Sequence, residues 1–470
     1  MSIKVRFAPS PTGPFSVGNA RTALFNWLFA KHEGGEFLLR IEDTDKERSE
    51  KKFEDDIIHG LEWLGLTSNG EIIRQSERSE IYKTYLNKLL EGGLAYWCFC
   101  TTEELEIERQ AQLSQGLAPK YSGRCRGISH EEAQKRLQNE TAVIRFKMPE
   151  KTISFHDIVR GKVEFKTALI GDIIIAKNLK EPLYNFTAAI DDFEMKITHV
   201  IRGEDHLSNT PKQIALQEAL GFNHPHYAHL PLILGPDRKK LSKRFLEHSL
   251  LDYKNAGYLP QALMNFLVLL GWHPEEDKEI LGIGEMIKEF NLKRVQKGGA
   301  IMNSEKLEWL NAHYIKTLPT NELFEYLKPF IPAFWLNQET MIKKIVEVEK
   351  IRLKRLTDFP KQTSFFFMLS DYPKDLLNWK ETENSVTLAN LKKISEIVKK
   401  IPTDEFLKEG IEKNIMALTK EKGRGEVLWP LRVALSGEEA SPGPIELIDI
   451  LGKDETVARI EIAIKKLKNG

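Results

Sequence analysis

The sequence predicts a doubly wound α/β fold that is followed by a region made of helices alone. Over about the first hundred residues, strand-like runs alternate with amphipathic helical runs, which is typical of a parallel sheet. Charged residues follow the strand-like runs where they end, and ligands bind at that edge of an open α/β sheet. From about residue 320 the periodicity is almost wholly helical. At 470 residues, the chain is long enough for two or three domains.

The first strand and the first helix frame a turn rich in proline, serine, threonine and glycine. Residues 3–7 alternate apolar and basic side chains, which predicts a strand, and residues 19–30 carry apolar side chains at helical spacing. Such a turn presents backbone N–H groups and the positive end of the helix dipole to an anion. We therefore predict a phosphate site at residues 7–13, although the turn matches neither GxxxxGK[ST] nor GxGxxG. A simple turn is the alternative.

Two later strands also end in charged residues. Residues 36–41 form a mostly apolar run that ends at Glu42-Asp43-Thr44-Asp45, and residues 197–201 lead into Arg202. An arginine that faces Glu42 across a cleft suits an amino-acid substrate, because a guanidinium group pairs bidentately with a carboxylate. The alternatives are a solvated loop with Asp45 capping the next helix, and a surface arginine at position 202.

Apolar residues at helical spacing predict helices at residues 50–67 and 81–94, and a further helix that holds Asp191-Asp192. A strand-like run at residues 230–235 precedes the basic segment 239–244. By itself this basic segment indicates a solvated loop or a weak targeting signal.

Residues 95 to about 185 interrupt the alternation of strands and helices. Cys98, Cys100, Cys125 and Tyr121 lie here, and three thiolates with one phenolate could hold a tetrahedral structural zinc. Cysteines without a metal are the alternative. Residues 142–147 and 170–177 are predicted strands in the second half of this segment.

Composition narrows the class of protein. Hydrophobic residues make up 41% and charged residues 29% of the chain, as in ordinary globular proteins. We expect neither a membrane span nor a signal peptide, since no apolar run is long enough. Three clustered cysteines do not form a disulfide framework and indicate a reducing, cytoplasmic location. Because the formal net charge is zero, a nucleic-acid partner must be recognised by local basic faces.

Several motifs in order along the chain resemble bacterial glutamyl-tRNA synthetases. Residues 6–13, 17–24 and 38–45 have sequences typical of that family. Ser16-Val17-Gly18-Asn19 occupies the place of the family's HIGH motif, and Lys239-Lys240-Leu241-Ser242-Lys243-Arg244 resembles its KMSKS loop. Residues 428–437 match a segment of the family's anticodon domain. The resemblance spans essentially the whole chain.

The resemblance implies a domain organisation. A Rossmann-like class I synthetase catalytic domain is expected at residues 1–95 and 185–245, with an inserted α+β acceptor-binding subdomain at 96–184. A helical stem-contact domain at 246–320 and an all-α anticodon-binding domain at 321–470 are expected to follow.

The resemblance also implies an activity. The family activates L-glutamate with ATP and Mg²⁺ and transfers it to the 3′-terminal adenosine of tRNA(Glu). Charging of tRNA(Gln) stays open, as does bound Zn²⁺, and a monomer is the family's default. Residues that match glutamate-binding positions are Arg6, Ala8, Ser10, Glu42, Tyr184 and Arg202. ATP-binding matches are Thr12, Gly18, Asn19 and Lys243, the catalytic matches are Ser16, Lys240 and Lys243, and the zinc-site matches are Cys98, Cys100, Tyr121 and Cys125.

Three positions depart from the family pattern. Ser16 replaces the leading histidine of HIGH, residues 245–248 replace a segment that begins His-Gly, and Gly127 replaces a histidine that some members offer to zinc. A serine hydroxyl is shorter than an imidazole and carries no charge. We hypothesise that Ser16 weakens activation without abolishing it, because Ser10, Thr12, the helix N-terminus and Lys243 remain.

Other classes of protein are alternatives to the synthetase. A paralogue that binds tRNA or regulates, with weak catalysis, is favoured by Ser16 and the altered segment 245–248. The glutamyl-queuosine relative lacks a helical C-terminal half, and glutaminyl-tRNA synthetases typically carry a β-barrel anticodon domain. The basic stretch at residues 343–355 and Phe365-Phe366-Phe367 predict either a solvated helix face beside core aromatics or contacts to an anticodon loop.

Overall fold

The computed structural model describes residues 2–239, 249–403 and 406–469. Two compact units make up the chain, and each is treated by itself. Unit 1 comprises Met1–Asn255 and Pro260–Leu307, and unit 2 comprises Ala256–Leu259 and Glu308–Gly470. Among the described residues, no helix is long and apolar enough to cross a membrane. The finer division into four domains stays a prediction.

Unit 1 is built on a seven-stranded sheet. In order across the sheet, the strands are β3 (Ile73–Arg74), β2 (Glu36–Ile41), β1 (Lys4–Phe7), β10 (His199–Gly203), β11 (His226–Leu230), β6 (Thr152–Asp157) and β7 (Gly161–Lys166). All neighbours pair in parallel except β6 and β7, which form an antiparallel hairpin. The chain leaves β1 toward β2 on one side, whereas β10 and β11 lie on the other. This reversal between β1 and β10 is where doubly wound sheets bind ligands.

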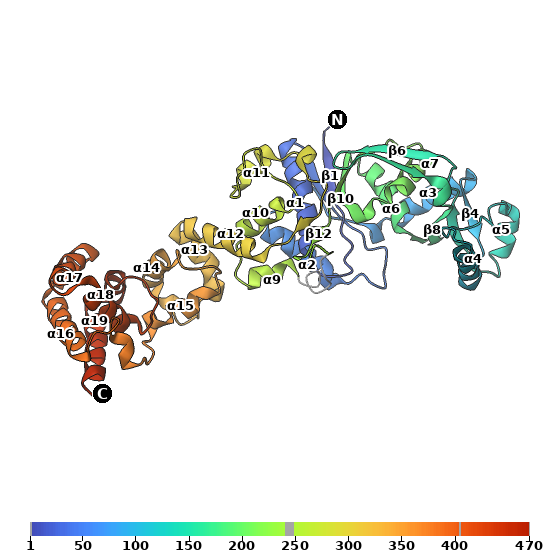
Figure 1. Ribbon diagram of the computed structural model, residues 1–470. Helices are drawn as coiled ribbons and strands as arrows, with labels where there is room; N and C mark the ends of the chain where they lie inside the picture. Colours follow the sequence, from blue (N-terminus) through green and yellow to red (C-terminus); the bar gives the residue numbers. More distant parts are fainter. Residues whose placement is uncertain (1, 240–248, 404–405, 470) are drawn as a thin grey trace. The chain divides into compact units, whose positions relative to one another are not determined.

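Helices cover the central strands on both sides. Helix α1 (Val17–His32) packs against β1, β2 and β10 and also against α10 (Pro260–Leu269) and α11 (Ile283–Glu289). Right-handed crossovers in opposite directions from the centre of the sheet put their helices on opposite faces. Figure 1 accordingly shows α1, α10 and α11 on one side of β1 and β10, and α6 on the other. The predicted α/β fold is confirmed.

The predicted strands and helices of unit 1 differ from the structure mainly at their ends. The apolar run at 36–41 is strand β2 with the predicted bounds. Helix α2 (Lys51–Trp63) stops before residue 67, since Gly65 adopts a left-handed φ of 71°. The run at 230–235 is interrupted at Pro231, which has no backbone N–H to donate to a strand ladder. The remaining helices of unit 1 are α3 (Ser79–Glu91), α4 (Thr102–Ser114), α5 (His130–Arg136), α6 (Tyr184–Glu194), α7 (Thr210–Leu220) and α9 (Leu250–Asn255).

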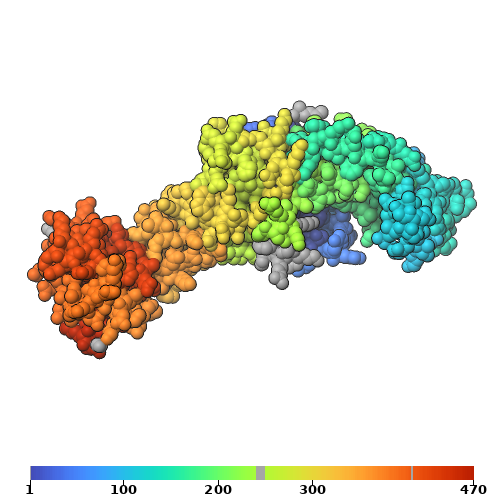
Figure 2. Space-filling model, in the orientation of Figure 1, coloured from blue at the N-terminus to red at the C-terminus, as the bar shows by residue number. Residues whose placement is uncertain are grey.

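A second, four-stranded antiparallel sheet lies within residues 95–182. Its strands are β4 (Ala95–Cys98), β5 (Val143–Phe146), β8 (Ile173–Asn178) and β9 (Glu181–Pro182), in that order. The strands predicted at 142–147 and 170–177 are therefore present as β5 and β8. Figure 2 shows the residues around 100, in cyan, forming a lobe at one end of unit 1. A short parallel pair, β12 (Ile233–Leu234) with β13 (Ala300–Ile301), completes the sheets of the unit.

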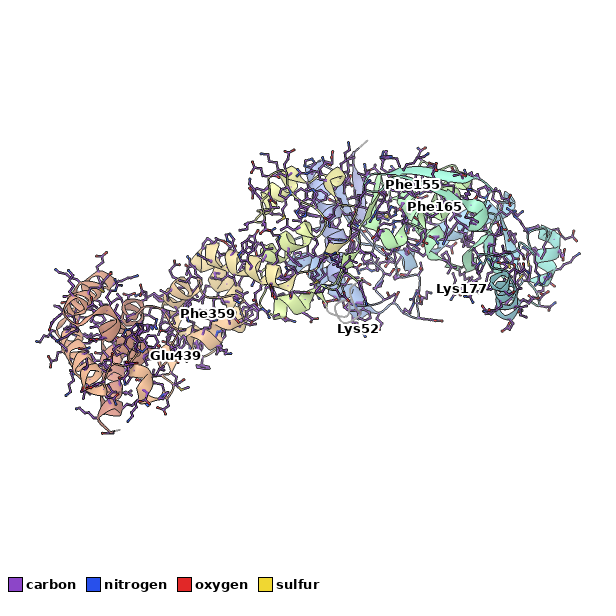
Figure 3. The ribbon with its side chains drawn as sticks, viewed as in Figure 1. Lys52, Phe155, Phe165, Lys177, Phe359 and Glu439 are labelled. Carbon is purple, nitrogen blue, oxygen red and sulfur yellow. The ribbon has the colours of Figure 1, made fainter. Side chains whose placement is uncertain are left out.

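The β6–β7 hairpin was not predicted, and it belongs to the large sheet rather than to the second one. It joins through β11, where Tyr227 is opposite Asp157. Figure 3 labels Phe155 on β6 and Phe165 on β7. Exposed and more buried residues alternate along both β6 and β7, as expected for strands that have one face covered by the rest of the protein.

Unit 2 is helical, as predicted. The side chain of Arg459, on the last helix, is 2% exposed and links that helix to two others. It donates hydrogen bonds to the carbonyl oxygens of Phe365 and Leu435 at 2.7 and 2.6 Å. The last helix breaks at Gly452, whose φ is 79°. The boundary between the units falls within α12 (Ser304–Thr317), and the helices that follow are α13 (Thr320–Leu327), α14 (Glu339–Glu349), α15 (Asp358–Phe367), α16 (Asn384–Lys400), α17 (Lys408–Lys422), α18 (Arg424–Ser436) and α19 (Pro444–Lys468).

Candidate active site

The turn after β1 ends in a capped helix N-terminus. Ser16 is the N-cap residue of α1: its backbone is extended, and its Oγ accepts a hydrogen bond from the Asn19 N–H at 3.4 Å. Serine is among the preferred N-cap residues, so the residue that replaces the family histidine also stabilises the start of α1. The first turn of α1 contains no acidic residue, which leaves its positive end available to an anion.

A cavity of about 1320 Å³ opens at the carboxyl ends of β1, β2 and β10. It collects predicted site residues that are as many as 196 positions apart in the sequence. Those that line it are Arg6, Ala8, Ser10, Thr12, Ser16, Gly18, Asn19, Glu42, Tyr184 and Arg202. Lys240 and Lys243 lie outside the described residues.

One wall of the cavity is a buried network of charges. Asp192 accepts hydrogen bonds from Arg6 Nε at 3.0 Å and from Arg40 Nη1 at 2.7 Å. Arg40 also donates from Nη2 to Glu42 Oε1 at 2.9 Å, and the Glu42 backbone N–H donates to the Pro9 carbonyl. All four charged side chains are at most 6% exposed. Glu42 and Arg6 therefore keep fixed orientations before any ligand binds.

Burial and pairing act in opposite directions on the two carboxylates. Burial alone would raise the pKa of Asp192, but the guanidinium groups of Arg6 and Arg40 outweigh it and hold the pKa below its usual value. For Glu42 burial dominates and raises the pKa, although Arg40 opposes the rise. Asp192 is thus the firmly ionised member of the network.

Arg202, at the end of β10, has a different environment. It is 5% exposed and donates to Gln213 Oε1 at 2.9 Å, to Thr210 Oγ1 at 2.8 Å and to His229 Nε2 at 3.3 Å. None of these acceptors is a carboxylate, and no ion pair joins Arg202 to any acid in the described part of the chain. A buried cation without a counter-charge is costly unless a ligand supplies one.

The hydroxyl group of Tyr184 lies beside the side chains of Arg202 and His206. It lies 2.9 Å from His206 Nδ1 and accepts from Arg202 Nη1 at 3.4 Å. Burial raises the pKa of Tyr184, so its hydroxyl keeps its proton at neutral pH. Burial lowers the pKa of His206 to about 4, which leaves the imidazole neutral.

Exposed basic side chains, which no sequence motif singled out, also border the cavity. They include Lys46 and Arg48 after β2, and Lys177 on β8, which Figure 3 labels, together with Lys180. Such lysines and arginines bind phosphate groups by charge.

The three cysteines and Tyr121 form a separate cluster. The sulfur atoms all lie within 4.8 Å of one another, and Cys100 Sγ is 3.5 Å from Cys125 Sγ. The Tyr121 hydroxyl is 3.4 Å from the sulfur atoms of both Cys98 and Cys100. A tetrahedral zinc with bonds of about 2.3 Å to sulfur and about 2.0 Å to oxygen separates its ligand atoms by about 3.5 to 3.8 Å. The observed spacing therefore fits a zinc ion.

The sequence patterns did not single out Arg40 and Asp192, two members of the buried network of charges. Arg40 was quoted only as part of a motif, and Asp192 only as part of a helix. A lone arginine within an apolar, buried strand was the available signal for Arg40, because such a charge requires a partner. No local pattern identified that partner, which lies 152 residues away.

Comparisons with known proteins agree with this geometry. Residues 2–309 match the catalytic domain of class I tRNA synthetases (E and Q), and residues 322–464 match an anticodon binding domain. The chain therefore belongs to the class I tRNA synthetases of the glutamate and glutamine type. Among its relatives are glutamate–tRNA ligases, which it matches over nearly their whole length.

Two of these relatives and one solved structure illustrate the similarity. A glutamate–tRNA ligase of Thermodesulfovibrio yellowstonii is 45% identical over 98% of this chain and 99% of its own. Glutamate–tRNA ligase 2 of Thermoanaerobacter pseudethanolicus is 43% identical over 98% of both chains. The crystal structure of a glutamate tRNA ligase from Elizabethkingia meningosepticum, in complex with its amino acid, is 36% identical and superposes with a TM-score of 0.88 over 99% of this chain and 100% of its own.

Proposed function

We propose that the chain is a glutamate–tRNA ligase, which activates L-glutamate with ATP and transfers it to the 3′-terminal adenosine of tRNA(Glu). The observation that carries this proposal is the charge balance of the buried wall. The wall contains four guanidinium groups, those of Arg6, Arg40, Arg78 and Arg202, and three carboxylates, those of Glu42, Asp191 and Asp192. Asp191 pairs with Arg78 at 2.8 Å and lies 4.0 Å from Arg40. The wall therefore has one uncompensated positive charge, and glutamate carries two negative charges and one positive.

The assignment of groups follows from their partners. Arg202 has neutral acceptors and is free to pair with a substrate carboxylate. Glu42 is the carboxylate placed to accept from the ammonium group. Arg6, Ala8, Ser10 and Tyr184 complete the proposed glutamate site.

The first chemical step is attack of the glutamate α-carboxylate oxygen on the α-phosphorus of ATP. One C(O)O–P bond forms and the P–O bond to pyrophosphate breaks, which gives glutamyl-adenylate. The N-terminus of α1, with Ser16, Gly18 and Asn19, is proposed to bind the phosphates, and Lys240 and Lys243 to stabilise the departing pyrophosphate. ATP enters as its magnesium complex, so this metal arrives with the substrate.

The second step is attack of the 2′-hydroxyl of the terminal adenosine on the activated carbonyl. The new ester bond forms as the bond to AMP breaks, and the hydroxyl proton passes to a phosphate oxygen of the departing AMP. Neither step requires a side-chain nucleophile, because positioning and charge stabilisation supply the catalysis. The basic residues at the cavity border are proposed to hold the phosphates of the acceptor end.

Cys98, Cys100, Cys125 and Tyr121 would hold a zinc ion with a structural role. The ion would fix the ends of β4 and of the segment around residue 125 to each other, and it takes no part in the reaction. Burial and the neighbouring thiols raise the pKa of Tyr121, so the phenol would lose its proton only on binding the metal.

Charging with labelled glutamate, ATP and Mg²⁺ tests the proposal on purified tRNA(Glu) and tRNA(Gln) separately. We expect charging of tRNA(Glu), and charging that falls at least about a hundredfold in Arg202→Met, since that variant leaves a substrate carboxylate unpaired. Charging of tRNA(Gln) as well would define a ligase that requires a partner amidotransferase. Binding of tRNA without charging of either would replace the proposal by the regulatory paralogue. We further propose a monomer that acts in the cytoplasm.

A further inference from the structure

A chain of buried polar groups runs from Arg202 away from the cavity. Its members are Arg202 on β10, His229 on β11 and Asp157 on β6, which are adjacent strands. Asp157 Oδ2 lies 2.6 Å from His229 Nδ1, and His229 Nε2 accepts from Arg202 Nε at 3.3 Å. Asp157 and His229 are fully buried, and neither lines the cavity. The hydrogen-bonded side chain that links them to the cavity is Arg202.

The hydrogen bonds determine which nitrogen of His229 carries the proton. Asp157 Oδ1 accepts from the backbone N–H groups of Val159 and Arg160, at 3.0 and 2.8 Å, so the carboxylate is held ionised as an acceptor. His229 Nδ1 must then be the donor, which leaves Nε2 as an acceptor that faces Arg202. Thr210 adds to this arrangement, since its Oγ lies 3.0 Å from His229 Nε2 and accepts from Arg202.

A neutral acceptor at this place has a specific consequence for Arg202. A carboxylate in direct contact with the guanidinium would orient it but would also neutralise it, as Asp192 does for Arg6. An imidazole nitrogen orients the group and leaves its charge for the ligand. The negative charge of Asp157 is kept one residue further away.

We propose that Asp157 and His229 are positioning residues, which hold the guanidinium group of Arg202 ready for a substrate carboxylate without neutralising it. This inference rests on the proposed function, because it takes that carboxylate to belong to glutamate. It assigns the β6–β7 hairpin, which the sequence analysis did not detect, a part in amino-acid recognition. Figure 3 shows the position of Phe155 on this hairpin. The centre of the Phe155 ring is 6.5 Å from the centre of the His229 ring.

Two substitutions of the same histidine separate positioning from packing. His229→Gln puts an amide oxygen near the place of Nε2, where it can accept from Arg202. His229→Asn puts an amide nitrogen near the place of Nδ1, where it can donate to Asp157 but leaves Arg202 without its acceptor. A third variant, Asp157→Asn, favours the other histidine tautomer, with a proton directed at Arg202, as in the aspartate-to-asparagine change of a serine-protease triad.

The matched control is Tyr227→Phe. Tyr227 lies two residues from His229 on the same strand, is 3% exposed, and donates to Gln217 at 3.2 Å. The control therefore also removes one buried hydrogen bond from β11, but it keeps the aromatic ring, whose centre lies 5.9 Å from the guanidinium carbon of Arg202. Thermal unfolding of all four variants shows which of them fold.

The measurement is tRNA(Glu) charging by the full-length chain, with KM determined for glutamate and for ATP. We expect Asp157→Asn and His229→Asn to raise the glutamate KM by about tenfold to a hundredfold, the cost of one hydrogen bond to a charged group, with little change in the ATP KM. His229→Gln and Tyr227→Phe should stay close to the unaltered chain.

Equal glutamate KM values for His229→Asn and His229→Gln would overturn the inference, as would an effect confined to kcat or to the ATP KM. In either case the unaltered chain still charges tRNA(Glu), so the proposed function would stand. If the unaltered chain fails to charge, the proposed function and the inference are both wrong.

Discussion

Replacing Ser16 with histidine measures what the departure from the HIGH motif costs the proposed activation step. Ser16 is 8% exposed, borders the cavity and caps α1. An imidazole at this position has the cavity to extend into. The substitution therefore changes two things: the cap of the helix and the donor available to the ATP phosphates.

The two contributions differ in size. Loss of an N-cap hydrogen bond costs about 1 kcal/mol of stability, and the Oγ–N distance of 3.4 Å puts this bond at the weak end of that range. One transition-state donor contributes about 3 kcal/mol, which is two to three decades in rate. We therefore expect Ser16→His to speed adenylate formation by about a hundredfold while lowering the stability of the chain slightly.

The assay is pyrophosphate release at saturating glutamate, ATP and tRNA(Glu), with thermal unfolding measured in parallel. Ser16→Ala is the control, since it loses the cap and offers no donor. It should lose a similar amount of stability and react more slowly than the unaltered chain. If Ser16→His forms adenylate at the same rate as the unaltered chain, histidine supplies the phosphates with no interaction that serine lacks, and the predicted gain is wrong.

Three further predictions concern the buried charges and the cysteine cluster. Asp192→Asn leaves Arg6 and Arg40 without their shared acid, so we expect a loss of about 3 to 5 kcal/mol in denaturant unfolding and a raised glutamate KM, and an unchanged KM would contradict the proposed site. Metal analysis should find one zinc per chain and less in Cys100→Ser, whereas a zinc-free unaltered chain after zinc loading would exclude the metal site. Burial raises the pKa of Glu349 to about 7, although Arg352 opposes the rise. The pKa of Glu349 is higher in the folded state than in the unfolded state, so folding favours the protonated carboxyl group. The contribution of Glu349 to the free energy of unfolding is therefore fully present below about pH 4.5 and falls by about 3 kcal/mol as the pH rises to 7. Glu349→Gln should remove this part of the pH dependence of thermal unfolding, and identical profiles would contradict it.

Local pattern was enough to predict most of the elements around the cavity. Strand β2 has the predicted bounds, because a continuous apolar run that ends in charged residues describes a parallel strand buried on both faces. The turn after β1 was predicted from its own residues, since proline, glycine and serine specify backbone geometry over short distances. The resemblance of separated motifs then indicated which side chains belong together.

Contacts distant in the sequence were beyond such patterns. The partners of Arg40 and Arg202 lie on other strands and helices, so no spacing within one segment reveals them. The β6–β7 hairpin is short, and its place in the large sheet depends on the pairing of Asp157 with Tyr227 on β11. Register between distant strands is decided by which faces are buried in the folded molecule.

The α/β class, the helical second unit and the residue types that a glutamate and phosphate site requires can all be predicted from local sequence. These features depend on periodicity, turn chemistry and composition, which act within a few residues. Which arginine carries an uncompensated charge follows from the folded arrangement and not from any local pattern. That property depends on burial and on the partners that the fold brings within hydrogen-bonding distance, and for Arg202 these are neutral groups, whereas for Arg6 the partner is a carboxylate.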